Sequence, residues 1–157
     1  MQPREPQWKP EVTVTAVIER EGRFLLIEKY SRPGIRNNQP AGHLEHGKSL
    51  IKALIRETLE ASAREFRPQA LPGIYQYAHP GNGVTCLRLG FTGSPSETRP
   101  RCRPDAGIRR AQWMRLDEIR ACGDRHRSPM LQRCVDDHPA GLRHPLRAMR
   151  HFNRTPA

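Results

Sequence analysis

Two glutamates three residues apart are the side chains of this sequence best suited to chemistry. Glu57 and Glu60 lie in the segment SLIKALIRETLEASAREF, which starts at Ser49. On a helix, a separation of three residues places two side chains roughly 60° apart, so both carboxylates can reach one point in space. Converging carboxylates repel each other unless a cation lies between them. Magnesium prefers oxygen ligands and keeps several waters, so this pair could hold Mg²⁺ against a phosphate.

The same two carboxylates could instead do no more than solvate an exposed helix face. Lys52, Arg56 and Arg64 are close in sequence and could pair with them. Surface ion pairs of this kind are common and contribute little to stability. The spacing alone therefore leaves a metal site and a solvated surface both open.

Local signals predict the helix that positions the pair. Gly47 breaks the chain, Ser49 is a suitable N-cap, and neither Gly nor Pro follows until Pro68. We therefore predict a helix from about Ser49 to about Glu65. Its apolar face, which should pack on a core, is predicted to comprise Leu50, Ile51, Leu54, Ile55 and Leu59, with Thr58 among them.

The segment that begins at Gly42 resembles the Nudix box, G-x5-E-x7-R-E-U-x-E-E-x-G-U, where U is a bulky apolar residue. Gly42 falls on the first glycine, and Arg56 and Glu57 fall on the Arg-Glu pair. Glu60 falls on the first glutamate of the Glu-Glu pair, and the spacing is kept throughout.

Four residues depart from this motif. Lys48 stands where the first glutamate is expected, and Ala61 stands where the second residue of the Glu-Glu pair is expected. Ala63 replaces the last glycine, and Arg64 replaces the last apolar residue. Ala61 removes one oxygen donor and one negative charge, while Lys48 adds a positive charge. We therefore expect a reduced affinity for magnesium.

Further segments are similar to the small bacterial NudJ-type phosphatase branch of the Nudix family. They occur in the order WKPEVTVTAVIEREGRFLLIEKY, NQPAGHLE, CLRLGF, QWMRLDEI and RSPML, and cover most of the chain. The resemblance implies an α/β (α+β) fold, a Nudix-type α/β/α sandwich with a mixed central sheet. It also implies dependence on Mg²⁺, with Mn²⁺ as a possible substitute, and attack of water on phosphorus. Thiamine-type pyrophosphates and nucleoside di- and triphosphates are the substrates it implies.

The resemblance also implies roles for the residues that match the motif. Glu57 would be a metal ligand or the base that activates water, and Glu60 would be a metal ligand. Arg56 would orient the catalytic carboxylates through a salt bridge. The carbonyl of Gly42 would be a further ligand.

The ligand lost at Ala61 leaves three outcomes open. Glu45 or Asp105 can substitute as an oxygen ligand, or the metal can bind only together with a phosphate substrate. The third outcome is a domain that has lost hydrolysis and kept binding. His43 and His46 are also near, but magnesium disfavours their nitrogen donors.

Two classes of function follow. The first is a metal-dependent hydrolase of a small nucleoside or thiamine-type di- or triphosphate. The alternative is a catalytically impaired Nudix-fold domain that binds a nucleotide or pyrophosphate ligand. Lys48 and Ala61 favour the alternative, whereas Arg56, Glu57 and Glu60 favour the hydrolase, which we prefer.

Several basic and acidic side chains are candidates for contacts with the substrate. The resemblance implies that the predicted strand before Lys29 frames the cleft, although Lys29 could equally lie on a solvated edge. It also implies that the loop containing Asp105 can close over the substrate. Arg127 belongs to the segment RSP of the resemblance. The full set of candidate substrate-binding residues is Lys29, His43, Arg88, Asp105 and Arg127.

The length and composition of the chain limit the possible number of domains and the classes of protein. A chain of 157 residues is long enough for one domain with one sizeable core, spanning residues 1–157. We find neither a long apolar run nor the apolar region of a signal peptide, so we expect a cytoplasmic protein without a membrane partner. The cysteines, which lack CxxC spacing, are expected to be free thiols: Cys86, Cys102, Cys122 and Cys134.

The net charge of +11, from 27 Lys and Arg against 16 Asp and Glu, attracts polyphosphates, RNA and acidic partners alike. With two Trp, three Tyr and four Phe and no recognisable nucleic-acid motif, the chain does not indicate dedicated nucleic-acid binding. A small phosphorylated substrate is the partner we expect.

The remaining elements follow from alternation, turn residues and prolines. We predict an extended lead-in over 1–10 and a hairpin of strands 12–19 and 23–28. A turn is predicted at Asn37-Asn38 and a short strand beyond it. Further strands are predicted over 74–79, 84–92 and 108–114, with a long loop over 93–107. Helices should begin at Leu116 and at Ser128-Pro129, and the tail 142–152 should pack on the sheet.

Overall fold

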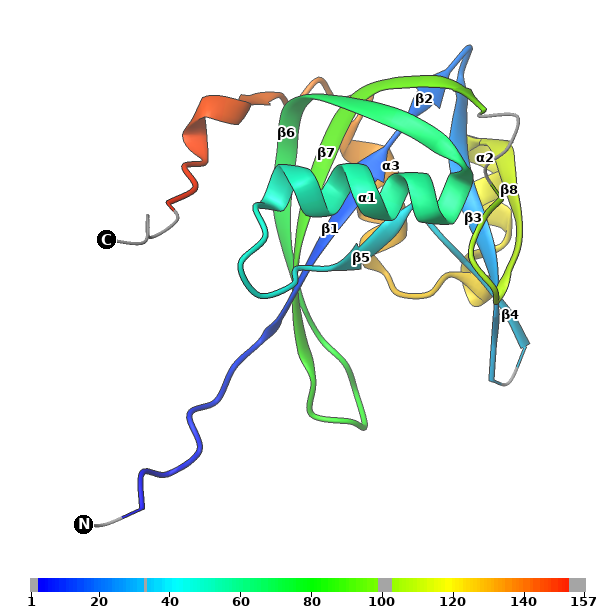
Figure 1. Ribbon diagram of the computed structural model, residues 1–157. Helices are drawn as coiled ribbons and strands as arrows, with labels where there is room; N and C mark the ends of the chain where they lie inside the picture. The colour runs from blue at the N-terminus through cyan, green and yellow to red at the C-terminus, as the bar shows by residue number, and fades with distance from the viewer. Residues whose placement is uncertain (1–2, 33, 99–102, 153–157) are drawn as a thin grey trace.

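The computed structural model describes residues 3–32, 34–98 and 103–152 (Figure 1). Two sheets and three α-helices account for most of this part of the chain. In chain order the elements are β1 (Glu11–Val17), β2 (Glu19–Arg20), β3 (Arg23–Ser31), β4 (Gly34–Asn38), β5 (Ala41–His43), α1 (Leu50–Ser62), β6 (Arg64–Ala78), β7 (Thr85–Thr98), β8 (Ile108–Arg115), α2 (Leu116–Ala121), α3 (Met130–Asp137) and β9 (His144–Pro145). Short 3₁₀ turns follow α2 and β9.

The larger sheet has the strand order β5-β1-β7-β6-β9. Strand β1 runs parallel to β7, and the other pairs are antiparallel, so the sheet is mixed. Helix α1 crosses one face of this sheet, and α3 lies behind the opposite face (Figure 1). The predicted mixed α/β sandwich is therefore confirmed.

Alternation along the strands divides the core between the two faces. In β1, the side chains of Val14 and Ala16 pack with Leu54 of α1, whereas Val17 packs with Leu131 of α3. Successive side chains of a strand point to opposite faces, so a run of buried residues serves both helical layers. Residues 13–18 are all buried for this reason.

The smaller sheet is centred on β3, which pairs with β2, β4 and β8. The predicted hairpin of strands 12–19 and 23–28 is only partly correct. Only the end of the predicted first strand, at Glu19, pairs with β3, as part of β2 around the positive-φ turn Glu21-Gly22. Strand β1 belongs to the other sheet because its whole length pairs with β7.

Helix α1 begins as predicted, because the Ser49 hydroxyl accepts a hydrogen bond from the Lys52 N–H at 3.1 Å. It ends at Ser62 rather than near Glu65, since Ala63 adopts a left-handed conformation with φ of 58°. Its buried face agrees in part with the prediction, since Leu50, Ile51 and Leu54 pack on the core and Thr58 is buried. Ile55 is 38% exposed, and the buried residues are Ala53, Leu54, Thr58 and Ser62.

Strands β6 and β7 are much longer than predicted. Pro68 was expected to end a helix, yet β6 runs from Arg64 through both of its prolines, with register shifts at Pro68/Ala70 and Ala70/Gly73. Prolines are tolerated in strands at such irregular positions. The predicted loop over 93–107 is wrong for residues 93–98, which belong to β7. Gly93 permits this pairing, because a Cβ there would lie 2.0 Å from the carbonyl oxygen of Arg67.

The ends of the chain and the smaller predictions agree more closely. Residues 3–10 form neither helix nor strand, and β9 pairs with β6 while Leu146 and Met149 pack on the core, as expected for the tail. Asn37-Asn38 is not a turn, since both residues lie in β4.

Three cysteines are free thiols, at positions 86, 122 and 134, and Cys102 lies outside the described residues. None of the helices in the described ranges is long and apolar enough to cross a bilayer.

Candidate active site

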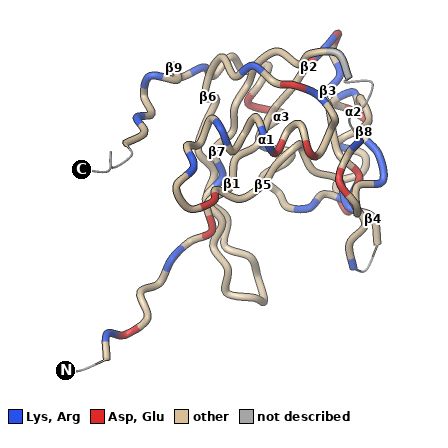
Figure 2. The backbone as a smooth tube through the Cα atoms, in the orientation of Figure 1, with Lys and Arg blue, Asp and Glu red and all other residues tan. Residues whose placement is uncertain are grey.

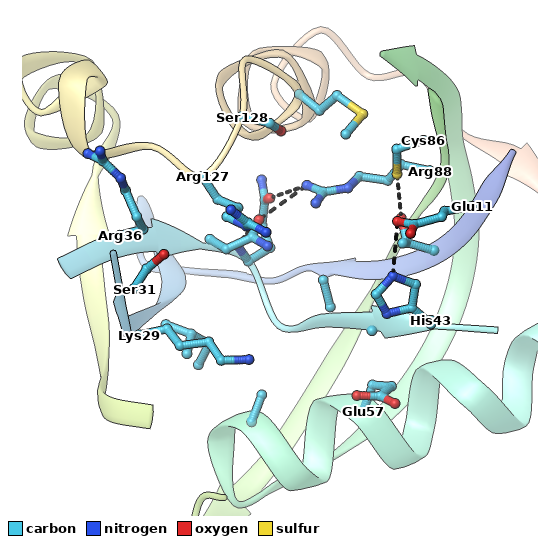
Figure 3. A pocket seen from close by; sticks show the side chains of 18 of the residues that line it. Glu11, Lys29, Ser31, Arg36, His43, Glu57, Cys86, Arg88, Arg127 and Ser128 are labelled. Atoms are coloured by element: carbon cyan, nitrogen blue, oxygen red, sulfur yellow. Dashed lines mark hydrogen bonds and ion pairs between the residues drawn. The ribbon is translucent and has the colours of Figure 1, made fainter. Parts of the chain in front are cut away.

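A cleft of about 530 Å³ opens beside α1, between β1, β5 and β7 on one side and β3 and β4 on the other (Figure 3). Its walls carry many of the side chains that the sequence singles out. The predicted site residues that line it are Lys29, Gly42, His43, Glu45, Glu57, Arg88 and Arg127. Arg56, Glu60 and Asp105 are not part of its lining and lie around it.

Glu57 packs directly against the backbone of β5. A Cβ placed on Gly42 would lie only 2.0 Å from Cδ of Glu57, a distance that no side chain could occupy. Only glycine therefore lets α1 bring this carboxylate against β5. The glycine at the start of the box-like segment is thus required by a contact with the first glutamate of the helix.

Arg56 joins three carboxylates on the outer side of this contact. Its guanidinium donates to Glu45 Oε2 and to Glu57 Oε1, each at 2.7 Å, and its Nε lies 3.7 Å from Glu60 Oε1. The hydrogen bond with Glu57 is the main cause that raises the pKa of Arg56. Because one rigid guanidinium holds Glu57 and Glu45 at once, the orientation of Glu57 depends on Arg56.

Glu60 lies in the most negative part of the site. Partial burial and the charges of Glu57 and Asp105 raise the pKa of Glu60, although Arg56 opposes the shift. Asp105 is brought close by its backbone N–H, which donates to the carbonyl oxygen of Glu60 at 2.9 Å. The fold therefore gathers acidic side chains around one end of the cleft: Glu45, Glu57, Glu60 and Asp105.

Few side chains at the acidic end of the cleft could donate oxygen ligands to a metal ion. Across residues 3–32, 34–98 and 103–152, no three or more His, Cys, Asp or Glu side chains are grouped so that they could hold a metal ion. Ala61 presents a methyl group to the cleft where the box has a carboxylate. The available donors are oxygens, and magnesium is commonly bound through one or two carboxylates together with water and substrate phosphate. The residues present fit a metal of that kind.

The other predicted site residues that line the cleft do not belong to its acidic group. His43 lies 3.3 Å from Glu11 Oε2 and is exposed, so its closest polar partner is not Glu57. Lys29 and Arg127 are exposed at the rim, and the backbone N–H of Arg127 donates to the carbonyl oxygen of Asn37 at 2.8 Å. This bond connects the chain before α3 to β4.

A buried polar network at the far end of the cleft was missed. The Nη1 of Arg88 donates to Asn38 Oδ1 and to Gln39 Oε1, both at 3.2 Å, and Gln39 Nε2 donates to the carbonyl oxygen of Leu131 at 3.0 Å. Asn38 and Gln39 open the segment NQPAGHLE, which was the available signal. Their partner lies 50 residues from Asn38 and 49 from Gln39 in sequence, so spacing could not reveal the contact.

The chain is similar in sequence to a known protein family. A model of the NUDIX domain matches residues 9–134, most of the chain. The chain belongs to the Nudix family. As a Nudix phosphohydrolase it joins a family that generally uses divalent metals, typically Mg²⁺, and acts on small phosphorylated substrates.

Individual Nudix relatives agree with this assignment. Phosphatase NudJ of Escherichia coli K12 is 32% identical over 146 residues, covering 93% of this chain and 94% of the relative. A NUDIX hydrolase from Nitrosomonas europaea is 45% identical with a TM-score of 0.88, covering 92% of this chain and 98% of that one. A MutT NUDIX hydrolase from Burkholderia pseudomallei, 20% identical over 83% of this chain and 98% of its own, shares the fold with a TM-score of 0.69.

Proposed function

We propose that this Nudix enzyme hydrolyses a small nucleoside or thiamine-type di- or triphosphate by attack of water on phosphorus. The observation that carries the proposal is the position of Glu57, which faces the cleft while Gly42 and Arg56 hold it from two sides. A fixed carboxylate on the wall of a cleft can accept a proton from a water molecule that attacks a bound phosphate. The similarity to a protein named phosphatase NudJ supports hydrolysis of a phosphorylated substrate.

We further propose that Glu57, Glu60 and the carbonyl of Gly42 hold Mg²⁺, or Mn²⁺ in its place, with Glu45 as a further oxygen donor. Bound there, the ion would neutralise phosphate charge and polarise a phosphoryl oxygen. The like charges around Glu60 support a cation at this end, because they raise the cost of ionising that carboxylate. Asp105 lies on the same side and could add a donor when the substrate is bound.

Other side chains of the cleft would position the carboxylates and bind the substrate. Arg56 is a positioning residue, since it reaches the substrate only through the carboxylates that it holds. Lys29 and Arg127 would bind phosphate oxygens from the rim, and His43 would contact the substrate beside β5. Positive groups placed around a phosphate stabilise the charge of the transition state.

Release of phosphate from a panel of substrates tests the proposal. The panel comprises thiamine pyrophosphate, nucleoside diphosphates and nucleoside triphosphates, each with magnesium, manganese or no metal. Glu57→Gln removes the proposed base with little change in size, and Glu5→Gln in the exposed lead-in is the matched control. We expect metal-dependent release that Glu57→Gln abolishes and Glu5→Gln preserves.

Two results would contradict the proposal. Full activity of Glu57→Gln would show that another group activates water. Absence of turnover with every metal and substrate, together with a rise in melting temperature on adding the same compounds, would favour a domain that binds phosphorylated ligands without hydrolysing them.

A further inference from the structure

The end of the cleft away from Glu57 carries positive charge. Arg88 reaches it from β7 and Arg127 from the segment before α3 (Figure 3). Arg88 is only 4% exposed, yet it lines the cleft, so a ligand there can approach its guanidinium. This end is distinct in charge from the acidic end around Glu57 and Glu60.

Arg88 is a buried cation that the protein itself does not neutralise. Its described hydrogen bonds go to the neutral amide oxygens of Asn38 and Gln39. Its Nε has no hydrogen-bond partner in the described part of the chain, and no described Asp or Glu forms an ion pair with it. A buried charge without a counter-ion is costly, so folding alone gives no reason to place an arginine here.

None of the groups that shift the pKa of Arg88 is a carboxylate, and Glu11, which lies on the same side of the cleft in Figure 3, pairs with His43 instead. Burial raises the pKa of the Cys134 thiol to about 11, so this thiol is neutral at physiological pH. Arg127 adds a second positive charge close enough to lower the pKa of Arg88, although burial is the main cause of that shift. Arginine stays protonated even so. Two cations therefore share a wall of the cleft without a described carboxylate between them.

We propose that Arg88 and Arg127 form a binding site for a tetrahedral oxyanion, either a phosphate group of the substrate or free orthophosphate. Guanidinium groups recognise phosphate oxygens through charge-assisted hydrogen bonds. Arg88 is held by Asn38 and Gln39 before any ligand arrives, whereas Arg127 is exposed at the rim and can close on the anion. The first source rests on the proposed function, while the second does not depend on hydrolysis.

Binding of inorganic phosphate to the metal-free protein tests this site. Titrations by calorimetry and by thermal shift, with EDTA present, would compare the wild type with Arg88→Gln, Arg88→Lys and Arg127→Gln. Arg125→Gln is the matched control, because Arg125 is exposed nearby and does not line the cleft. We expect Arg88→Gln to weaken phosphate binding roughly ten- to a hundredfold, the loss typical of a charged hydrogen-bonding group. Arg127→Gln should weaken it less, Arg88→Lys should restore part of the affinity, and Arg125→Gln should leave it unchanged.

The design separates a binding role from a structural one and from general attraction to a basic protein. If Arg88→Gln does not fold, Arg127→Gln tests the same site at an exposed position. The proposal is wrong if the wild type shows no phosphate-dependent rise in melting temperature. It is equally wrong if Arg88→Gln or Arg127→Gln binds phosphate as the wild type does, or if Arg125→Gln loses as much affinity as they do.

Steady-state kinetics then identifies the source of the anion. If the site takes a phosphate of the substrate, orthophosphate should inhibit competitively, and Arg88→Gln should raise KM more than it lowers kcat. If the site takes free orthophosphate, inhibition should not be relieved by substrate, and KM should stay the same. Glu57→Gln should lose turnover but keep phosphate binding, so failure of the proposed hydrolysis and failure of this site give different results.

Discussion

At the scale of single residues, the site depends on which side chain meets each carboxylate. Arg56 contacts Glu45, Glu57 and Glu60, so one cation orders the whole acidic end of the cleft. Ala61 places a methyl group in the lining beside them. The acidic end thus has Arg56 as its counter-ion and, because of Ala61, one carboxylate fewer than the Nudix box provides.

Ala61→Glu should restore a carboxylate and increase the affinity for magnesium by about tenfold, because the affinity of such sites rises with the number of charged oxygen ligands. Ala61 lines the cleft and is not fully buried, so a longer side chain has room there. The rise in melting temperature with magnesium concentration measures the affinity, and phosphate release measures turnover.

Ala61→Gln is the control for this substitution, since it adds the same bulk without charge. If Ala61→Glu changes neither magnesium affinity nor turnover, the ligand set must have been rebuilt elsewhere in the site.

At the scale of elements, the site is positioned by how α1 is joined to its neighbouring strands and by how β3 is bonded to β8. Helix α1 approaches β5 through Gly42, and it leaves through Ala63 into β6. Strand β3 is bonded to β8 through Glu28, which accepts hydrogen bonds from Arg109, Arg110 and Gln112.

Gly42→Ala should displace Glu57, because the new methyl group would overlap its carboxylate. We expect kcat/KM to fall on the order of a hundredfold, the loss that a displacement of about 1 Å can cause at a catalytic group. The melting temperature should fall only modestly, since the displaced side chain lies at the wall of the cleft. Kinetics and thermal unfolding of the same variant measure the two effects. An unchanged kcat/KM would contradict the role given to this contact.

Ala63→Val should destabilise the protein by about 2 kcal/mol, because a β-branched residue is strongly disfavoured in the left-handed region and the site is buried. Ala63→Gly should change stability by less than about 1 kcal/mol, since glycine adopts this conformation without strain. Urea unfolding distinguishes the two. Equal stability of both variants would show that the turn does not limit the end of α1.

Glu28→Gln should lower stability by about 2 kcal/mol at neutral pH, because it weakens three charge-assisted hydrogen bonds to a buried group. Its bonds to Arg110 and Arg109 lower the pKa of Glu28 below the ordinary value of 4.5. The carboxylate therefore contributes stability above that value and loses it as the pH falls through the lowered pKa. Urea unfolding of wild type and variant should show a gap at pH 7 that narrows under acid. A gap independent of pH would contradict this account.

At the scale of the whole molecule, the charge of +11 surrounds a cleft with one acidic and one basic end. Lys and Arg are spread over many elements rather than gathered on one (Figure 2). Such a field attracts polyphosphates from solution.

Added salt should therefore reduce kcat/KM for a nucleoside triphosphate more than for the corresponding diphosphate, since the triphosphate carries more charge. We expect a several-fold loss between about 0.02 M and about 0.2 M ionic strength, the range over which the screening length falls to the size of the cleft. Potassium chloride titrations at constant magnesium measure it. Salt dependence that is the same for both substrates would contradict attraction by the net charge of the protein.

Interactions between neighbouring residues were sufficient to predict the local elements of this fold. Ser49 and the unbroken run after it predicted α1, and the spacing of Glu57 and Glu60 placed both on one side of that helix. The match to the Nudix box predicted the family and the α/β sandwich, and both were confirmed. Short-range signals were sufficient here because capping and helical periodicity act within a few residues.

The pairing of segments far apart in the chain became known only from the three-dimensional fold. Strand β1 pairs with β7 instead of β3, which is nearer in sequence. Strands β6 and β7 continue through prolines that, from the local sequence, were predicted to end an element. The contact of Gly42 with Glu57 and the network of Arg88 with Gln39 likewise join residues from different strands and helices. Strand pairing and burial are set by partners far away in the sequence, so no local pattern carries that information.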